Sequence, residues 1–298
     1  MAGFIQDPIQ FVNLIADNLR DRYQTGFPVL KELIQNTDDA PATELHYGLS
    51  SGLPSAIHPL LKGPGLFLIN NGEFKPSDAR GIRSFGQNSK AADQASIGKF
   101  GLGMKSVFHF CETFFFLAHD GTRAYAEVLN PWSGADSEQT LHRDWDEFSE
   151  QDAQTIRRYV SGITKKISSD PNQCFILWLP LRKKDHLYLP NGERAGAIVS
   201  EYPGDDVALL DFLDDDSLGV KIAALIPMLR HVKRAAYWKL EGVSEAAKPH
   251  FDIILSEGAE RPSLVDVEQD VLDAARSKRN ALKGRIRVII NAANKYIG

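Results

Sequence analysis

Three polar side chains recur at helical spacing near the start of the chain. The stretch "VLKELIQNTDDA" at 29–40 carries Glu32, Asn36 and Asp39 among apolar residues. At roughly 100° per residue, positions i, i+4 and i+7 fall within an arc of about 60° on one side of a helix. The apolar residues occupy a different arc and can pack on a sheet. Two interpretations stay open: a solvated polar edge, or one wall of a site.

A glycine-rich stretch supplies the second group of residues that suits chemistry. In "IGKFGLGMKSVFHF" at 97–110, Gly98, Gly101 and Gly103 come directly before an apolar helical run. Glycines let several backbone N–H groups point at one place, and a helix N-terminus after such a turn binds anions such as phosphate. Turns of this kind also serve plain packing. The strand–turn–helix order of a dinucleotide-binding motif is missing, and GxxxxGK[ST] is absent, so Rossmann and P-loop sites are disfavoured.

The elements that must position these residues follow from hydrophobic periodicity and turn signals. The expected helices are 8–22, 28–40, a short one near 77–85, a polar helical excursion within 136–170, 205–214, 219–233, a charged one at 265–282, and the apolar run after the glycine turn. The expected strands are 42–49, 65–70, a hairpin within 112–130, a central strand at 174–181, 235–242, 250–256 and 285–291. Helices and strands in separate runs predict an α+β fold: a two-layer sandwich whose mixed, mostly antiparallel sheet is covered on one face by helices.

Composition narrows the class of protein. The 298 residues have a formal net charge of -5, which disfavours a general nucleic-acid partner, although a local basic patch is compatible with it. Cys111 and Cys174 lie in apolar stretches, which predicts isolated buried thiols rather than a disulfide framework or zinc site. Asp7 and Asp17 interrupt the first apolar segment, so no signal peptide is expected. No apolar run is long enough to cross a bilayer, and we expect a cytoplasmic protein without a membrane partner.

The motifs, taken together, resemble those of a known superfamily. They are Glu32-x-x-x-Asn36-x-x-Asp39-Ala40, Asn70-x-Gly72 and Gly98-x-x-Gly101-x-Gly103, in that order. This set is similar to the GHKL ATPases, which share the Bergerat nucleotide-binding fold. "VLKELIQNTDDAPATEL" and "SKAADQASIGKFGLGMKSVFHF" look most like the sacsin-type, chaperone-like subgroup. The resemblance covers about 10–240. It implies an ATP-binding domain at 1–240, a C-terminal α/β extension at 241–298 that begins a transducer domain, and a slow Mg²⁺-dependent ATPase.

The resemblance also implies a role for each residue of the motifs. Glu32 is expected to orient and deprotonate the attacking water, and Asn36 to bind Mg²⁺ through its amide oxygen. Asp39 and Ala40 are expected near the ribose and base. The remaining residues implied in nucleotide binding are Asn70 and Gly72 at the adenine, Gly98, Lys99, Phe100, Gly101, Leu102, Gly103 and Lys105 at the phosphates, and Ser89 and Lys90 in a closing lid.

The chain departs from the family pattern on the adenine side. Asn70 stands where the family usually has an aspartate that accepts from the adenine amino group. An asparagine can still accept through its carbonyl oxygen, but its NH₂ then needs a partner, for which Asn71 or a water is a candidate. Glu73-Phe74 replaces a second glycine, and Gln173-Cys174 stands where a Gly-Thr is usual. Adenine remains the expected base, while the preference for it stays open.

Two functions from different classes follow. The first is an ATPase whose lid closes on nucleotide and controls a protein client, a partner domain or a homodimer. The second is a nucleotide-sensing or client-binding module with negligible hydrolysis. Other candidates are weaker: His109 reads as a packed helix residue, and "DFLDDDS" at 211–217 and "RSKRNALKGR" at 276–285 read as solvated charged faces.

Overall fold

A computed structural model gives the fold of the chain. It describes residues 7–22, 26–83, 103–134, 140–199, 216–240, 248–255, 288–292 and 295–297. The α-helices are α1 (Pro8–Arg22), α2 (Phe27–Asp39), α3 (Pro76–Arg83), α4 (Glu150–Tyr159), α5 (Ser161–Ile167) and α7 (Asp216–Leu225). The 3₁₀ helices are η1 (Pro59–Lys62), η2 (Gly103–His109), η3 (Arg143–Trp145), η4 (Pro171–Gln173), η5 (Lys184–Leu187) and η6 (Ile226–Met228). The strands are β1 (Glu44–Ser50), β2 (Gly65–Asn70), β3 (Phe114–His119), β4 (Ala124–Leu129), β5 (Phe175–Pro180), β6 (Arg234–Leu240), β7 (Phe251–Leu255), β8 (Val288–Ala292) and β9 (Lys295–Ile297).

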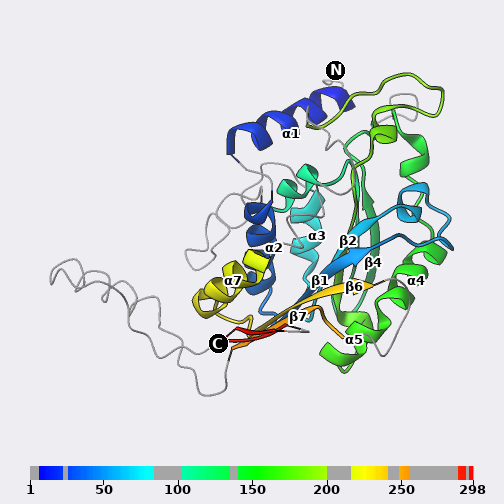
Figure 1. The fold of residues 1–298 in the computed structure, drawn as a ribbon. Coiled ribbons are helices and arrows are strands. Elements are labelled where there is room, and N and C mark those ends of the chain that lie inside the picture. Colours follow the sequence, from blue (N-terminus) through cyan, green and yellow to red (C-terminus); the bar gives the residue numbers. More distant parts are fainter. Residues whose placement is uncertain are drawn as a thin grey trace.

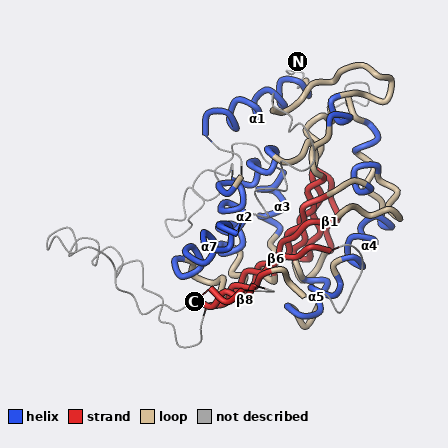
Figure 2. The backbone as a smooth tube through the Cα atoms, viewed as in Figure 1, coloured by secondary structure: helices blue, strands red, loops and turns tan. Residues whose placement is uncertain are grey.

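The strands of the described residues form one sheet in the order β4-β3-β5-β2-β1-β6-β7-β8-β9. The β1–β6 pair is parallel, and the other neighbouring pairs are antiparallel. Figure 2 shows the sheet running through the middle of the molecule with helices around it. The predicted mixed, mostly antiparallel sheet is therefore confirmed. The predicted hairpin is β3–β4, and Gly121 at its turn has φ 90°, a backbone conformation that favours glycine.

Helices α2, α3 and α7 lie along one face of the sheet (Figure 1). Every residue of β2 and β5 is buried, which matches the sequences of these two central strands, apolar except for Asn70 at the end of β2. On α2, Leu30, Leu33 and Ile34 are at most 2% exposed. Their arc of the helix packs towards the sheet, which leaves the polar arc to face elsewhere. The two-layer α+β sandwich predicted from the order of elements is confirmed.

The predicted polar excursion is also helical, and it adds a partial cover to the second face of the sheet. Helices α4 and α5 lie on the side opposite α2 (Figure 1). Tyr159 of α4 packs its ring edge-on to Trp178 of β5 at 5.8 Å between ring centroids. Its hydroxyl donates to the carbonyl oxygen of Leu240 at 2.6 Å.

Two predicted helices differ in the structure. The run after the glycine turn is the 3₁₀ helix η2 rather than an α-helix. The pattern at 219–233 becomes α7 followed by η6, because Pro227 has no N–H to continue the α-helical ladder. The helices expected at 205–214 and 265–282 lie outside the described residues.

The strands beyond residue 240 continue the same sheet. Strand β7 pairs with β6, and β8 pairs with β7. The predicted division into a domain at 1–240 and an extension at 241–298 stays a prediction. A truncated chain can test it.

Candidate functional site

The polar arc of α2 is the centre of the candidate site. Glu32, Asn36 and Asp39 are each half-buried, unlike the exposed Lys31. Burial raises the pKa of Glu32 above its usual value; Lys31 opposes this shift and the charge of Asp39 adds to it. The charge of Asp39 thus acts on Glu32 from about two turns away, as expected for residues that share a side of the helix. The arc is a partly shielded cluster rather than a freely solvated edge.

Asn36 carries an unsatisfied polar atom in this cluster. Its Nδ2 is buried and has no hydrogen-bond partner within the described part of the chain. Buried amides that lack a partner are rare in native proteins, because desolvation costs about 1–3 kcal/mol when no hydrogen bond replaces water. An amide offers an oxygen that suits a hard cation and N–H groups that suit an anionic oxygen. The donor set at Asn36 therefore fits a Mg²⁺–phosphate group.

The end of β2 is pressed against the C-terminal end of α2. A Cβ on Gly72 would lie 2.3 Å from the carbonyl oxygen of Ala40, so only glycine fits there. The same carbonyl accepts from the backbone N–H of Glu73 at 3.0 Å. Asn70, Gly72 and Ala40, which are implied in base binding, are thus brought next to the polar arc.

The side chain of Asn70 is buried and already bonded. Its Oδ1 accepts from the N–H of Gly72 at 3.0 Å, and its Nδ2 lies 3.4 Å from the Thr37 hydroxyl. That hydroxyl donates in turn to the carbonyl oxygen of Leu33. One lone pair of the Asn70 oxygen is thus engaged, which leaves its second lone pair as the remaining acceptor for a ligand.

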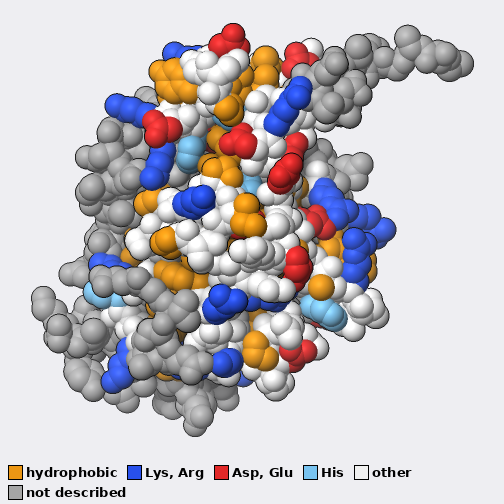
Figure 3. All heavy atoms as spheres, turned by 90° about the vertical axis from the view of Figure 1, so that its right-hand side faces the viewer, with side chains coloured by type: hydrophobic (Ala, Val, Ile, Leu, Met, Phe, Trp, Pro, Cys, Tyr) orange, Lys and Arg blue, Asp and Glu red, His pale blue; other side chains and the backbone are white. Residues whose placement is uncertain are grey.

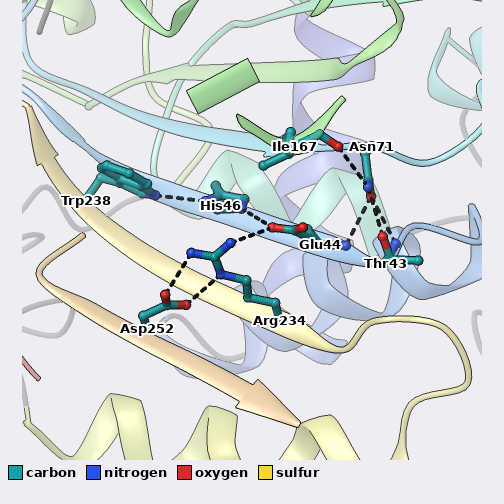
Figure 4. Close-up of polar contacts among 8 residues, drawn as sticks. All are labelled: Thr43, Glu44, His46, Asn71, Ile167, Arg234, Trp238 and Asp252. Atoms are coloured by element: carbon teal, nitrogen blue, oxygen red, sulfur yellow. Dashed lines mark hydrogen bonds and ion pairs between the residues drawn. The ribbon is translucent and has the colours of Figure 1, made fainter. Parts of the chain in front are cut away.

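Asn71 does not serve Asn70 as a partner. It points to the opposite side of the sheet (Figure 4), where its Oδ1 accepts from the N–H groups of Thr43 and Glu44, both at 3.0 Å. Its Nδ2 donates to the carbonyl oxygen of Ile167 at 3.2 Å. Successive residues of a strand face opposite ways, so Thr37 on α2 takes the place that we assigned to Asn71.

Asp38 is a positioning residue that lies outside the predicted site residues. Its carboxylate, in a side chain only 1% exposed, accepts from the backbone N–H groups of Arg230, His231 and Val232 at 2.9, 2.6 and 3.0 Å. These bonds join the end of α2 to the segment that leads into β6. A signal was present in the sequence, because position 38 is one turn beyond Ile34 on the apolar side of the helical wheel.

The phosphate side of the site is described only in part. Gly103 begins η2, and η2 packs against α2. Lys105 is 6% exposed, its Nζ donates to the carbonyl oxygen of Ile82, and burial lowers its pKa to about 8. A role for Lys105 at the phosphates stays a prediction. Further expected residues lie outside the described part of the chain: Ser89, Lys90, Gly98, Lys99, Phe100, Gly101 and Leu102.

A buried ion pair secures the far end of η2. Glu112 and Arg182 are both 0% exposed at their side chains, with 3.0 Å between Oε1 and Nε. Arg182 also donates to the carbonyl oxygens of Phe108 and Cys111, the residues around the end of η2. The pair thereby links η2, and with it Gly103, to the end of β5. We assign it a structural role.

A second polar cluster on the opposite face of the sheet is structural too (Figure 4). Arg234 donates to both carboxylate oxygens of Asp252 at 2.8 Å and to Glu44 at 3.1 Å. The buried His46 accepts at Nδ1 from the indole N–H of Trp238 at 3.0 Å, so its proton is on Nε2, 3.0 Å from Glu44. Both ring nitrogens are used, and no free group is left for catalysis.

The described residues contain no group of three or more metal-ligating side chains that could hold a metal ion by themselves. They also contain no helix long and apolar enough to span a membrane.

Cys111 and Cys174 are buried and free, as predicted. Burial raises the pKa of both thiols, that of Cys174 to about 11, so both are inert neutral groups at pH 7.

The fold and the site define a two-layer α+β domain with an acid–amide arc on the helix that packs against its central strands. Comparison with known proteins places this chain in a family. The model of the Sacsin domain family matches residues 10–188, and the chain belongs to that family. Human (Homo sapiens) sacsin is 38% identical over 113 residues, a match that covers 36% of this chain and 2% of that protein.

Proposed function

We propose that the chain is a nucleotide-binding domain of the GHKL (Bergerat) type within a sacsin-like protein, and that it binds and slowly hydrolyses Mg²⁺-ATP. The single observation that carries this proposal is the buried, unpartnered Nδ2 of Asn36 on the arc that it shares with Glu32 and Asp39. The chain matches a small part of human sacsin, so activity, client and partner are all proposals.

The described residues would each have a separate role in such a nucleotide site. Asn36 would hold Mg²⁺ through Oδ1, and the metal would neutralise phosphate charge. Glu32 would accept the proton of the attacking water, and its partly shielded position beside Asp39 makes it a stronger base than a solvated carboxylate. Asn70 would receive the base at its second lone pair, with Gly72 and Ala40 beside it. Lid closure over the nucleotide, a cytoplasmic location and nucleotide-dependent dimerisation belong to the same proposal.

A nucleotide-sensing or client-binding module with negligible hydrolysis is the second candidate. It is favoured by Asn70, whose amide is already hydrogen-bonded to Gly72 and Thr37. Such an amide should bind the adenine amino group more weakly than a free carboxylate does. It is also favoured by Lys105, whose Nζ is taken by Ile82.

Calorimetric titration of the purified chain with ATP, ADP and GTP, each with and without Mg²⁺, tests binding, base choice and metal need together. We expect ATP to bind more tightly with Mg²⁺, and Asn36→Ala to lose both binding and turnover. Glu32→Ala should keep binding and lose hydrolysis. Glu150→Ala, which removes an exposed acid from α4 on the other face, is the matched control and should change neither.

The outcomes separate the two candidates. Unchanged hydrolysis in Glu32→Ala would refute the catalytic role of Glu32. Firm nucleotide binding with phosphate release below about one turnover per hour would favour the sensing module, since ordinary enzymes turn over far faster. Absence of binding by all three nucleotides would refute both.

A further inference from the structure

A cavity of about 400 Å³ opens on the side of the sheet away from α2. Pro59 and Leu60 of η1 form one wall, and the 142–145 and 185–190 segments form the others. The ring of His58, beside Pro59, packs edge-on against Phe115 of β3 at 4.7 Å. Phe115 points to the face opposite that of its neighbour Phe116, whose ring contacts Phe74 on the α2 side. The sheet therefore separates this cavity from the proposed nucleotide site, and its size is that of a small-ligand pocket.

The walls of the cavity are held by hydrogen bonds within the protein. The carboxylate of Asp152 on α4 accepts from the N–H groups of Ile57 and His58 at 2.6 and 3.2 Å. The Nε2 of His58 donates to the carbonyl oxygen of Trp145 at 3.2 Å, while its Nδ1 accepts from the N–H of Leu60. The η1 wall is thus tied to both α4 and η3, so the cavity is preformed.

His142 supplies a polar atom that these bonds leave unused. Its ring stacks on Trp145 at 3.6 Å between centroids, with an angle of 2° between the planes. The side chain is only 1% exposed, and its Nε2 has no hydrogen-bond partner among the described residues. Burial lowers its pKa to about 4, so the ring is neutral at pH 7, and its Nε2 accepts a hydrogen bond in the tautomer that carries the proton on Nδ1. This atom is the sign that the cavity is built for a ligand.

The charged groups of the lining are all acidic at neutral pH. Asp144 and Asp185 are exposed, and the lining contains neither lysine nor arginine. Tyr188 is 49% exposed and offers an accessible aromatic ring. In the space-filling view of this side of the molecule, pale-blue histidine surface lies beside orange hydrophobic, red acidic and blue basic side chains (Figure 3). Carboxylates beside aromatic rings are the groups that recognise organic cations.

His186 adds a hydrogen-bond donor to the same lining. Its Nδ1 accepts from the backbone N–H of Lys183 at 3.3 Å, so the proton of the neutral ring is on Nε2. A free cation has no acceptor for this N–H group. A basic residue within a peptide has one, because the backbone carbonyl oxygen lies close to the cationic side chain.

We propose that this cavity binds an arginine residue of a partner peptide. Its guanidinium would lie between Asp144, Asp185 and the Nε2 of His142, and its backbone carbonyl would accept from His186. Arginine fits better than lysine, because its planar fork of five N–H donors reaches several acceptors at once and stacks on aromatic rings. The proposal is independent of nucleotide binding, since the site lies across the sheet from α2.

The test is a titration of the intact chain followed by two-dimensional NMR, with and without ATP. The ligands are N-acetyl-arginine N-methylamide and its neutral isostere, N-acetyl-citrulline N-methylamide. We expect the arginine compound to bind with a dissociation constant of about 1 mM or below, and the citrulline compound about tenfold more weakly. Asp144→Asn combined with Asp185→Asn should weaken the arginine compound about tenfold, and Glu147→Gln, an exposed acid outside the lining, should not. Both Asp side chains are exposed, so these variants should fold.

Further arms identify the source of the cation. Guanidinium chloride and spermidine, which lack the carbonyl acceptor, should bind several-fold more weakly than the arginine compound. His142→Phe, which keeps the ring stacked on Trp145 but removes Nε2, should also weaken binding several-fold.

The proposal is overturned by equal binding of arginine and citrulline, or by undiminished binding in the double aspartate variant. Absence of binding by the arginine compound at about 10 mM would overturn it as well. Tighter binding of a free cation than of the arginine compound would overturn the peptide as the occupant.

Discussion

At the scale of single residues, four histidines make the folded state sensitive to acid. Burial lowers the pKa of His46, His58, His142 and His186, the last two to about 4. Each is neutral in the folded state at a pH where the unfolded chain, with a pKa of about 6.5, already binds a proton. Their contribution to stability is therefore complete well above pH 6.5 and is lost as the pH falls below 6.5, towards 4 for His142 and His186.

We predict that the free energy of unfolding falls steadily between pH 7 and pH 5. His142 alone should account for roughly 2 kcal/mol at pH 5, given a folded-state pKa of about 4. Urea unfolding at pH 7, 6 and 5 measures the slope, and His142→Phe should make it shallower. Constant stability over this range would contradict the assignment of these histidines as neutral groups.

At the scale of elements, α2 is placed by bonds at its C-terminal end. Asp38 joins it to the segment before β6, and the carbonyl oxygen of Ala40 joins it to Glu73 after β2. The polar arc of α2 thus has its orientation set by two neighbours in the sheet, β2 and β6. A change at Asp38 should disturb stability and the candidate site together.

We predict that Asp38→Ala lowers the free energy of unfolding by about 2–4 kcal/mol, because three backbone N–H groups lose a charged acceptor. Asp38→Asn, which keeps one acceptor oxygen, should cost less. Chemical denaturation measures both. Asp17→Asn on the exposed face of α1 is the control, and breaking its surface pair with Arg20 should cost less than about 1 kcal/mol. Equal losses in the two aspartate positions would show that the three bonds of Asp38 contribute little.

At the scale of the whole molecule, the strands after residue 240 share a core with those before it. Phe251 of β7 lies 5.2 Å from Tyr237 and 6.1 Å from Tyr47 between ring centroids. Ile253 and Leu255 are also buried. Strand β7 thus completes the packing around β1 and β6, although the motifs themselves end earlier.

We predict that a chain ending at Leu240 is less stable than one ending at Leu255 by at least about 3 kcal/mol. The shorter chain lacks three buried apolar side chains, each contributing about 1.5–3 kcal/mol, and it exposes the edge of β6. Thermal unfolding of the two chains measures the difference. Equal midpoints would support the domain boundary at 240 that the motifs suggested.

The sequence by itself determined the secondary structure of the central sheet and the polar arc of α2. These depend on local periodicity: alternate or uniformly apolar residues in strands, and the i, i+4, i+7 spacing of Glu32, Asn36 and Asp39 in a helix. Such patterns depend only on residues that are close in the sequence. Once the strands are defined, few ways of pairing them in a sheet remain. The family resemblance depended on the same short stretches.

Tertiary structure alone decided which partner each polar group has. Asp38 and Asp39 are adjacent acids, yet one is consumed by a segment almost two hundred residues away and the other faces the arc. Lys105 and Asn71 looked available but are bonded to Ile82 and to β1 and α5. The cavity at His142 comes from segments far apart in the chain. Hydrogen bonding and burial depend on what the fold brings alongside a residue, and no local pattern carries that information.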